Sequence, residues 1–217
     1  MDPPSTAVTA LQALKKAQAG CSRCSLYLHA TQVVPGEGPA DAPLMFVGEQ
    51  PGDVEDRRGV PFVGPAGRLL DRAIADAGLD RVRIFVTNAV KHFKFEQRGK
   101  RRLHKRPDAY EIERCRWWLD QERAIVKPAI VVALGVTAAR GVLGRSVTIS
   151  KVRGEILGGD DGSRVLVTIH PSYLLRIEED EERAEAYQGF VKDLRVCAEM
   201  LERLGRQQPL KGAPEGT

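Results

Sequence analysis

Residues 42–48 read APLMFVG, and this short apolar run decides the fold. It follows a segment rich in proline and glycine, and a run of this length between turn residues predicts a buried strand. Three similar runs follow, with VRIFVT at 82–87, AIVVAL at 129–134 and RVLVTI at 164–169. Segments of helical character separate them. This alternation predicts a three-layer α/β/α sandwich around a central, mainly parallel four-stranded sheet.

The segments around the strands predict helices. Apolar residues recur at helical spacing after Thr6, and Pro65 suits the first turn of a helix. Helices are expected at residues 6–18, 65–77, 107–126, 135–143 and 179–204, and an edge hairpin strand near 152–157. The glycines and prolines of GEQPGDVEDRRGVPFVGPAG, at 48–67, predict an irregular loop instead. We expect a single domain over residues 1–206 and a disordered Gly- and Pro-rich tail at 207–217.

The composition is that of a soluble protein. The chain has 217 residues, of which 42% are hydrophobic and 29% charged, and this fits one domain with a sizeable core. No apolar stretch approaches the ~20 residues of a spanning helix, and the N-terminus lacks the features of a secretory signal. We expect a monomer in the bacterial cytoplasm, without membrane association. In that reducing compartment, the four cysteines are expected to be metal ligands or plain thiols rather than disulfides.

A basic stretch interrupts the pattern of strands and helices. The net charge is +4, and positive charge gathers in KHFKFEQRGKRRLHKR at residues 91–106. This stretch has no helical or strand period, so it predicts a long connection, and such connections are usually functional or disordered. A basic run is most often a solvated face or a polyanion patch. His104, taken alone, would most often face a phosphate group.

Polar residues follow three of the predicted strands. Glu49 and Gln50 come after the first strand, Asn88 after the second and His170 after the fourth. Ligands bind beyond the carboxyl ends of the strands in open parallel sheets. We therefore expect these side chains to meet at one rim of the sheet and to form the functional site there.

Five segments of the chain resemble the iron–sulfur superfamily of uracil-DNA glycosylases, close to family 4. They are GEQPG from Gly48, PFVGPAGRLLD from Pro61, VTNAVK from Val86, CRWWL from Cys115 and HPSYLLR from His170. They occur in the family's order over nearly all of residues 21–176. In addition, Gln50, His92 and the KRRLH segment resemble the UdgX-type branch, which excises uracil and then becomes covalently attached to the DNA through the histidine of that segment.

The resemblance implies an iron–sulfur centre. In the family, a Cys-x-x-Cys pair and two later ligands hold a [4Fe-4S] cluster, and the matching positions here are Cys21, Cys24, His92 and Cys115. Histidine ligates other clusters, but the same residues would also suit a tetrahedral zinc ion. A redox pair is a third reading of Cys-x-x-Cys. That motif usually opens a helix after a strand, whereas this one precedes the first strand. Cys197 is expected to be a buried thiol.

The resemblance also assigns the base pocket. Asn88 matches the residue that reads the Watson–Crick edge of uracil, Phe62 the aromatic that stacks on the base, and His170 the donor to uracil O2. Without the resemblance, these would be a turn Asn, a core Phe and a strand-end His. Ser172 is expected to grip a phosphate. Gly48 and Gly52 complete the predicted substrate-binding set, and Asp53 joins Glu49 and Gln50 as a predicted catalytic residue.

His104 is the sharpest prediction from the resemblance. A neutral imidazole in place of the attacking water would form a stable bond to the sugar carbon, and Glu49 would orient it or accept its proton. The role of Gln50 stays open. Uracil-containing DNA, preferably single-stranded, is the expected partner, with its phosphates held by Lys100, Arg101, Arg102 and Lys105. The loop before KRRLH is slightly short and Leu103 replaces a more usual Ile, which bears on how efficiently the crosslink forms.

Two rival functions fit parts of the same sequence. An ordinary glycosylase that turns over would use His104 only to bind phosphate. A non-catalytic, metal-stabilised nucleic-acid-binding module would account for the basic stretch and the Cys-x-x-Cys motif, but it would leave Glu49, Asn88 and His170 without a role.

Overall fold

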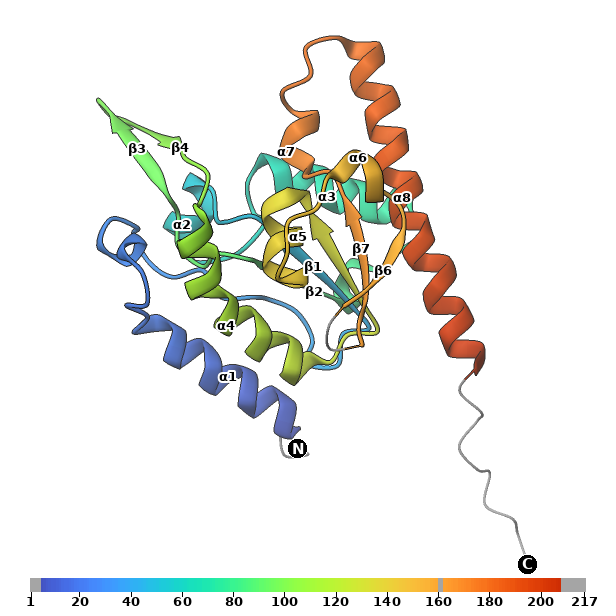
Figure 1. Ribbon diagram of the computed structural model, residues 1–217, viewed down its shortest axis with the longest axis horizontal. Coiled ribbons are helices and arrows are strands. Elements are labelled where there is room, and N and C mark those ends of the chain that lie inside the picture. The colour runs from blue at the N-terminus through green and yellow to red at the C-terminus, as the bar shows by residue number, and fades with distance from the viewer. Residues whose placement is uncertain (1–4, 160–161, 208–217) are drawn as a thin grey trace, which may run out of the picture.

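The computed structural model describes residues 5–159 and 162–207, which form a three-layer α/β/α sandwich (Figure 1). The strands of the central sheet are β1 (Leu44–Gly48), β2 (Ile84–Asn88), β5 (Ile130–Leu134), β7 (Arg164–Thr168) and β6 (Ile156–Gly158). Their order is β2-β1-β5-β7-β6, with all pairs parallel except β6 with β7. The four predicted parallel strands are confirmed, and the predicted edge strand is a fifth, antiparallel one. It begins only at Ile156, because residues before it form α6 (Ile149–Val152).

Helices cover both faces of the sheet because successive side chains of each strand point to opposite sides. Leu44 and Phe46 pack against α3 (Pro65–Asp76), α7 (Pro171–Leu174) and α8 (Asp180–Gln207). Met45 and Val47 pack against α1 (Thr6–Ala19), α4 (Ala109–Val126) and α5 (Gly135–Leu143). The predicted helices are thus confirmed to within a few residues. None of the helices in the described part of the chain is long and apolar enough to cross a membrane. The predicted tail lies outside the described residues, apart from Gln207, which ends α8.

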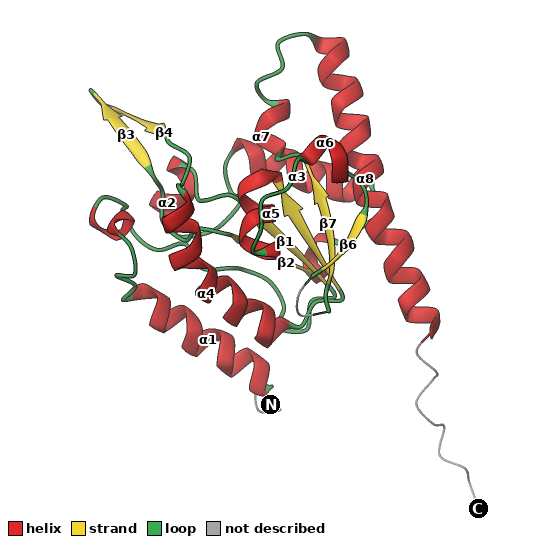
Figure 2. Ribbon diagram, viewed as in Figure 1, coloured by secondary structure: helices red, strands yellow, loops and turns green. Residues whose placement is uncertain are grey.

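The basic stretch is not the structureless connection that the sequence predicted. It contains β3 (Phe95–Arg98) and β4 (Arg101–His104), which pair as an antiparallel hairpin and project from the body, separate from the central sheet (Figures 1 and 2). Gly99 allows the turn between them, with φ at +58°. We call residues 95–104 the hairpin arm. The prediction was wrong because these two strands, FEQR and RRLH, consist mostly of polar and charged residues. They therefore lack the regular alternation of apolar and polar residues that marks a strand in a sequence.

The predicted irregular loop at 48–67 also contains regular structure. Residues 53–58 form a short helix, α2 (Asp53–Arg58), between Gly52 and Gly59. Glu55 holds its start, because its carboxylate accepts hydrogen bonds from the N–H groups of Gly52 at 3.1 Å and Gly64 at 2.7 Å. Gly59 ends the helix with φ at +71°, a conformation that favours glycine. The remaining regular elements are the 3-10 turns η1 (Ser25–Leu28) and η2 (Arg81–Arg83).

Candidate active site

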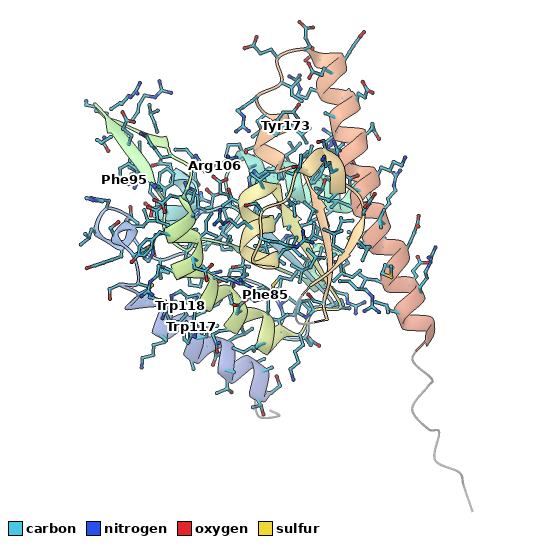
Figure 3. All side chains as sticks on the ribbon, viewed as in Figure 1. Phe85, Phe95, Arg106, Trp117, Trp118 and Tyr173 are labelled. Carbon is cyan, nitrogen blue, oxygen red and sulfur yellow. The ribbon has the colours of Figure 1, made fainter. Side chains whose placement is uncertain are left out.

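A cavity of about 700 Å³ lies beyond the carboxyl ends of the parallel strands. The predicted rim is confirmed, because residues from four strand ends and from the hairpin arm line this one cavity. Nine of the predicted site residues line it: Glu49, Gln50, Gly52, Asp53, Phe62, Asn88, His104, His170 and Ser172. It is also lined by residues to which the sequence assigned no role, among them Arg106, Leu175 and Arg176. In Figure 3, Arg106 lies between Phe95 of the hairpin arm and Tyr173 of α7.

Gly48 sets the shape of the inner pocket. A Cβ atom at this position would lie 2.4 Å from Asn88 Oδ1 and 2.6 Å from Phe62 Cζ, which is closer than real Cβ contacts. The carboxamide of Asn88, which is 2% exposed, therefore crosses the space that a side chain at Gly48 would fill. Asn88 thus forms part of the inner wall of the cavity.

Phe62 is held in an unusual conformation. Its φ is +57°, in a region that non-glycine residues rarely adopt and that is found often at functional sites. Gly67 makes this possible, because a Cβ atom there would lie 1.8 Å from the Phe62 carbonyl oxygen. The ring packs into the core below the pocket and lies 6.3 Å from the His170 ring, centroid to centroid. Phe62 is therefore placed at the pocket wall by its backbone.

The surroundings of His170 fix its protonation state. Burial lowers its pKa to about 4; the charge of Glu49 acts in the opposite direction, and those of His104 and Arg176 in the same direction. The imidazole is therefore neutral near pH 7. The Ser172 N–H donates to Nδ1 at 3.1 Å, and the Ser172 hydroxyl lies 2.8 Å from the same nitrogen. Because Nδ1 is an acceptor, the ring proton sits on Nε2, which leaves a neutral donor for a ligand.

His104 lies beside Glu49, as predicted. His104 Nε2 is 3.3 Å from Glu49 Oε1, although half of the His104 side chain is exposed. Thr137 donates its hydroxyl to Glu49 Oε2 at 2.6 Å, and Arg106 Nε is 3.6 Å from the same oxygen. Burial alone would raise the pKa of Glu49, but the hydrogen bonds of His104 and Thr137 and the charges of His104 and Arg106 lower it below its usual value. Glu49 is therefore an anion that faces His104.

Gln50 has a role that the sequence left open. Its Nε2 donates to the carbonyls of Lys94 at 3.1 Å and Lys105 at 3.0 Å, and its Oε1 accepts the Lys94 N–H at 3.0 Å. Lys94 and Lys105 flank the hairpin arm and are themselves paired by a backbone hydrogen bond of 3.0 Å. The side-chain amide of Gln50 thus ties both ends of the arm to the loop that carries Glu49.

Arg102 was expected to hold a DNA phosphate, and in the structure it is paired with groups of the protein itself. Its side chain is only 10% exposed, and its guanidinium donates to the carboxylates of Asp53 and Asp56 and to the Thr31 hydroxyl. It also lies over the Phe95 ring, 5.0 Å from the centroid. The N–H groups of Arg102 therefore bind side chains of the protein and hold the arm against α2.

The side chains of the other predicted DNA-binding residues are exposed to solvent. Lys100 and Arg101 are exposed at the turn of the hairpin arm. Lys105 is 57% exposed in its side chain and lies 3.0 Å from Glu96. Asp53, predicted as catalytic, lines the cavity but its carboxylate binds Arg57 and Arg102. Asp53 is therefore placed to hold the arm.

The sequence matches the Uracil DNA glycosylase superfamily over residues 35–195. The chain belongs to this superfamily. Among its relatives, the type-4 uracil-DNA glycosylase of Thermotoga maritima is 40% identical over 164 residues, which cover 75% of this chain and 82% of the relative. The type-4 enzyme of Archaeoglobus fulgidus is 31% identical over 196 residues, covering 87% and 90% of the two chains. A type-5 uracil-DNA glycosylase of Pyrobaculum aerophilum is 32% identical over 158 residues, covering 65% and 66%.

Three buried thiols lie together in this superfamily member. Cys21, Cys24 and Cys115 belong to one apolar cluster, which Trp118 and Val90 help to enclose, and none of them forms a disulfide. In Figure 3, Trp118 lies on the part of α4 that faces α1. Its indole N–H donates to Cys21 Sγ at 3.0 Å. Burial raises the pKa of Cys24, and raises that of Cys115 to about 12, so these sulfurs become thiolates only when a cationic group binds them.

A pair of arginines holds the two thiol-bearing segments together. Arg23 Nε donates to the Arg114 carbonyl at 3.0 Å, and Arg114 Nε donates to the Arg23 carbonyl at 3.2 Å. The Arg23 guanidinium also lies over the exposed Trp117 ring, 5.0 Å from its centroid. These contacts hold the Cys-x-x-Cys turn against α4.

His92 and Cys197 are both buried, in different places. Burial lowers the pKa of His92, with Asp56 acting in the opposite direction, so the imidazole is neutral as a metal ligand must be. Within the described ranges, no three Cys, His, Asp or Glu side chains meet around one point that could hold a single metal ion. Cys197 lies on α8 and is fully buried in the core, which confirms the predicted buried thiol.

Proposed function

We propose that this protein is a uracil-DNA glycosylase that excises uracil from DNA and then becomes crosslinked to the abasic sugar through His104. The observation that carries the excision step is the cavity in which Asn88, Phe62 and a neutral His170 converge, in a chain whose relatives are named uracil-DNA glycosylases. The observation that carries the crosslink is His104 Nε2 at 3.3 Å from Glu49, over the same cavity.

Recognition would take place on a base turned out of the helix. The Asn88 carboxamide can accept from uracil N3–H and donate to O4, while Phe62 covers the face of the ring. Cytosine presents the reverse donor and acceptor pattern, and this would leave buried groups unpaired at about 1–3 kcal/mol each. Asn88 stands at the end of β2, and the Phe62 backbone packs closely against Gly67, so the reading groups are preorganised.

Cleavage of the glycosidic bond leaves an oxocarbenium-like sugar and a uracil anion. The Nε2–H of His170 supplies a neutral donor to uracil O2, where negative charge develops. Because burial lowers the pKa of His170 to about 4, the ring stays neutral near pH 7 and its Nε2–H remains a donor. The Glu49 carboxylate lies on the side of the sugar and stabilises positive charge there.

The covalent step follows from the pairing of His104 with Glu49. The Nε2 proton passes to the Glu49 carboxylate, and the freed lone pair of Nε2 forms a bond to sugar C1′. This bond replaces the C1′–N1 bond, whose electron pair has left with uracil, and the proton that Glu49 has taken up passes to the uracil anion. The N–C1′ bond has no good leaving group, so the product stays attached and the enzyme does not turn over.

DNA would reach this site past exposed basic groups. Lys100 and Arg101 at the turn of the hairpin arm, with Arg176 at the cavity, can hold phosphates on either side of the turned-out nucleotide. Tyr173 and Leu175 are exposed apolar side chains beside the cavity, at 43% and 50%. Side chains of this kind can fill the gap that a turned-out base leaves. We propose single-stranded DNA as the preferred form and a monomeric protein.

The buried thiols fit an iron–sulfur cluster as the proposed cofactor. Cys21, Cys24 and Cys115, with His92 as the fourth ligand, would hold it. A single zinc ion requires all four ligands within about 2.3 Å of one point, whereas the irons of a cluster each take one ligand. The similarity of the chain to type-4 uracil-DNA glycosylases is what favours the cluster over zinc. Its role would be structural, since it would join the N-terminal segment to α4.

The test is a denaturing gel after incubation with single-stranded DNA that contains one uracil. A shifted band that resists detergent and heat is expected, and the His104→Ala variant should lose this band while still releasing uracil. His29→Ala, which replaces an exposed histidine outside the site, serves as the matched control and should crosslink like the wild type. Abasic DNA in excess of enzyme, without a band, would show an ordinary glycosylase. Binding indifferent to uracil would show a binding module.

The cofactor has its own test. The purified protein should show the broad visible absorbance of an iron–sulfur cluster, and Cys115→Ser should remove it, whereas Cys197→Ser should not. A colourless preparation that contains zinc would contradict the cluster.

A further inference from the structure

A fully buried lysine lies directly behind the base pocket. Lys91 follows β2, and its side chain is 0% exposed. Its Nζ donates to three oxygens, the Thr87 hydroxyl at 2.6 Å, the Asn88 carbonyl at 2.7 Å and the Glu122 carboxylate at 2.7 Å. An ammonium group has three hydrogens, so each of them has an acceptor here. One of these acceptors is the backbone of the residue that reads the base.

The partner carboxylate is enclosed as well. Glu122 on α4 is 1% exposed, and its Oε2 accepts from both Lys91 and the Thr87 hydroxyl. Its Oε1 accepts from the Gln18 side chain and from the Gly36 N–H, each at 3.1 Å. The network therefore joins α1, α4, β2 and the loop before β1. Replacing a buried ion pair by neutral side chains often leaves stability unchanged, so stability alone does not explain why the pair lies here.

The backbone after Asn88 links the pocket to the thiols. The next two N–H groups along the chain donate to the carbonyls of Gly48 at 2.9 Å and Glu49 at 3.0 Å. The N–H of Lys91 then donates to Cys115 Sγ at 3.2 Å. The segment 88–91 thus binds the loop that carries Glu49 through two of its N–H groups. It binds the Cys115 thiol through a third. The Lys91 side chain turns back to the first of the four.

We propose that Lys91 is a positioning residue for base recognition, which fixes the Asn88 peptide through its carbonyl and thereby aims the Asn88 carboxamide. Two hydrogen bonds to a base edge weaken steeply when their angles change, so a peptide that can rotate reads the base poorly. Glu122 and Thr87 hold the ammonium group at the one place from which it reaches that carbonyl. The inference rests on the proposed excision of uracil and adds the group that aligns its reader.

The experiment uses the double variant Lys91→Met/Glu122→Gln, which removes the ammonium group without leaving a buried charge unpaired. The rate constant for uracil release under single-turnover conditions should fall about tenfold, as expected for a misplaced contact group. Three other readouts should stay at the wild-type value: the Kd for uracil-free DNA, the melting temperature within a few degrees, and the visible absorbance. The last is expected because the Lys91 N–H is retained.

A similar network at the opposite edge of the sheet provides the control. Arg153 Nε lies 2.7 Å from Asp193 Oδ2, and the Thr168 hydroxyl donates to the same oxygen at 2.5 Å. It also joins a strand threonine, a helix carboxylate and a basic side chain, but it touches no residue of the cavity. The double variant Arg153→Met/Asp193→Asn should keep the wild-type rate.

The outcomes separate this inference from the proposed function. If the wild type leaves uracil in place, both fail. If the wild type releases uracil and Lys91→Met/Glu122→Gln does so equally fast, only the inference fails. An equal loss of DNA affinity and of rate would also overturn it, because that is the signature of general unfolding. If the double variant does not fold, Thr87→Val takes its place: it removes one Nζ acceptor, and the rate should fall about threefold at unchanged DNA affinity.

Discussion

The base pocket and the hairpin arm share one cavity but are built in opposite ways. The pocket groups Asn88 and His170 stand at the ends of parallel strands, and the Asn88 carboxamide lies close against Gly48. The arm has no core of its own. It depends on Gln50, which ties it to the loop after β1, and on Arg102, which ties it to α2. Excision should therefore be robust, whereas crosslinking should be easy to separate from it.

The largest effect is expected from Gly48→Ala. The added methyl group would lie 2.4 Å from Asn88 Oδ1 and displace both the carboxamide and the Phe62 ring. Uracil release and crosslinking should both fall at least about 100-fold, because the two steps share the recognition of the base. Gly158→Ala on β6 is the matched control, since a Cβ atom there meets nothing within 4 Å. A Gly48→Ala protein that still crosslinks efficiently would show that the pocket is not rigid.

Arg102→Met should separate the two steps. It removes the ties from the arm to Asp53 and Asp56 while leaving the base pocket intact. We expect crosslinking to fall about tenfold or more and uracil release by about threefold at most, so free abasic DNA should accumulate. The yields of crosslinked and free abasic DNA on one gel measure this ratio.

The exposed neighbour Arg101 gives the control for this experiment. Arg101→Met should weaken DNA binding and reduce its dependence on salt, with an unchanged ratio of crosslinked to free product. If Arg102→Met also weakened DNA binding without changing this ratio, Arg102 would be a phosphate ligand. The proposed role of its ion pairs with Asp53 and Asp56 in crosslinking would then be refuted.

The difference between pocket and arm also explains what the sequence could predict. A buried parallel strand is a continuous apolar run, so β1, β2, β5 and β7 were visible, and the topology placed Glu49, Asn88 and His170 at one rim. The hairpin arm was missed because its strands are stabilised by distant partners, not by an apolar face. Arg102 is positioned by Asp53 and Asp56, and no local pattern carries that information.

The sequence also did not predict the side-chain contacts between distant loops. Thr137 and Arg106 both contact Glu49, but they lie far from it in the sequence and belong to no motif. Gln50 was noticed because of the resemblance, yet its partners are backbone atoms of Lys94 and Lys105, which no residue type reveals. The lesson is that a strand end predicts where a side chain sits, whereas the group that orients it appears only in the folded protein.

The smallest change is expected from pH, and it tests whether the pocket keeps His170 neutral. With its pKa lowered to about 4 by burial, His170 should be about 1% protonated at pH 6, whereas an ordinary imidazole would be about three-quarters protonated there. When His104 is replaced, Glu49 loses the His104 hydrogen bond that lowers its pKa but keeps the Thr137 hydrogen bond and the Arg106 charge, which act in the same direction. Uracil release should be measured in His104→Ala, which forms no crosslink, and its rate should stay within about twofold from pH 8 to pH 6. The removal of His104 leaves the largest cause of the shift, burial of His170, in place. A fall in rate centred near pH 6.5 would mean that His170 titrates as an exposed histidine does, and the rigid pocket would then lose its neutral donor.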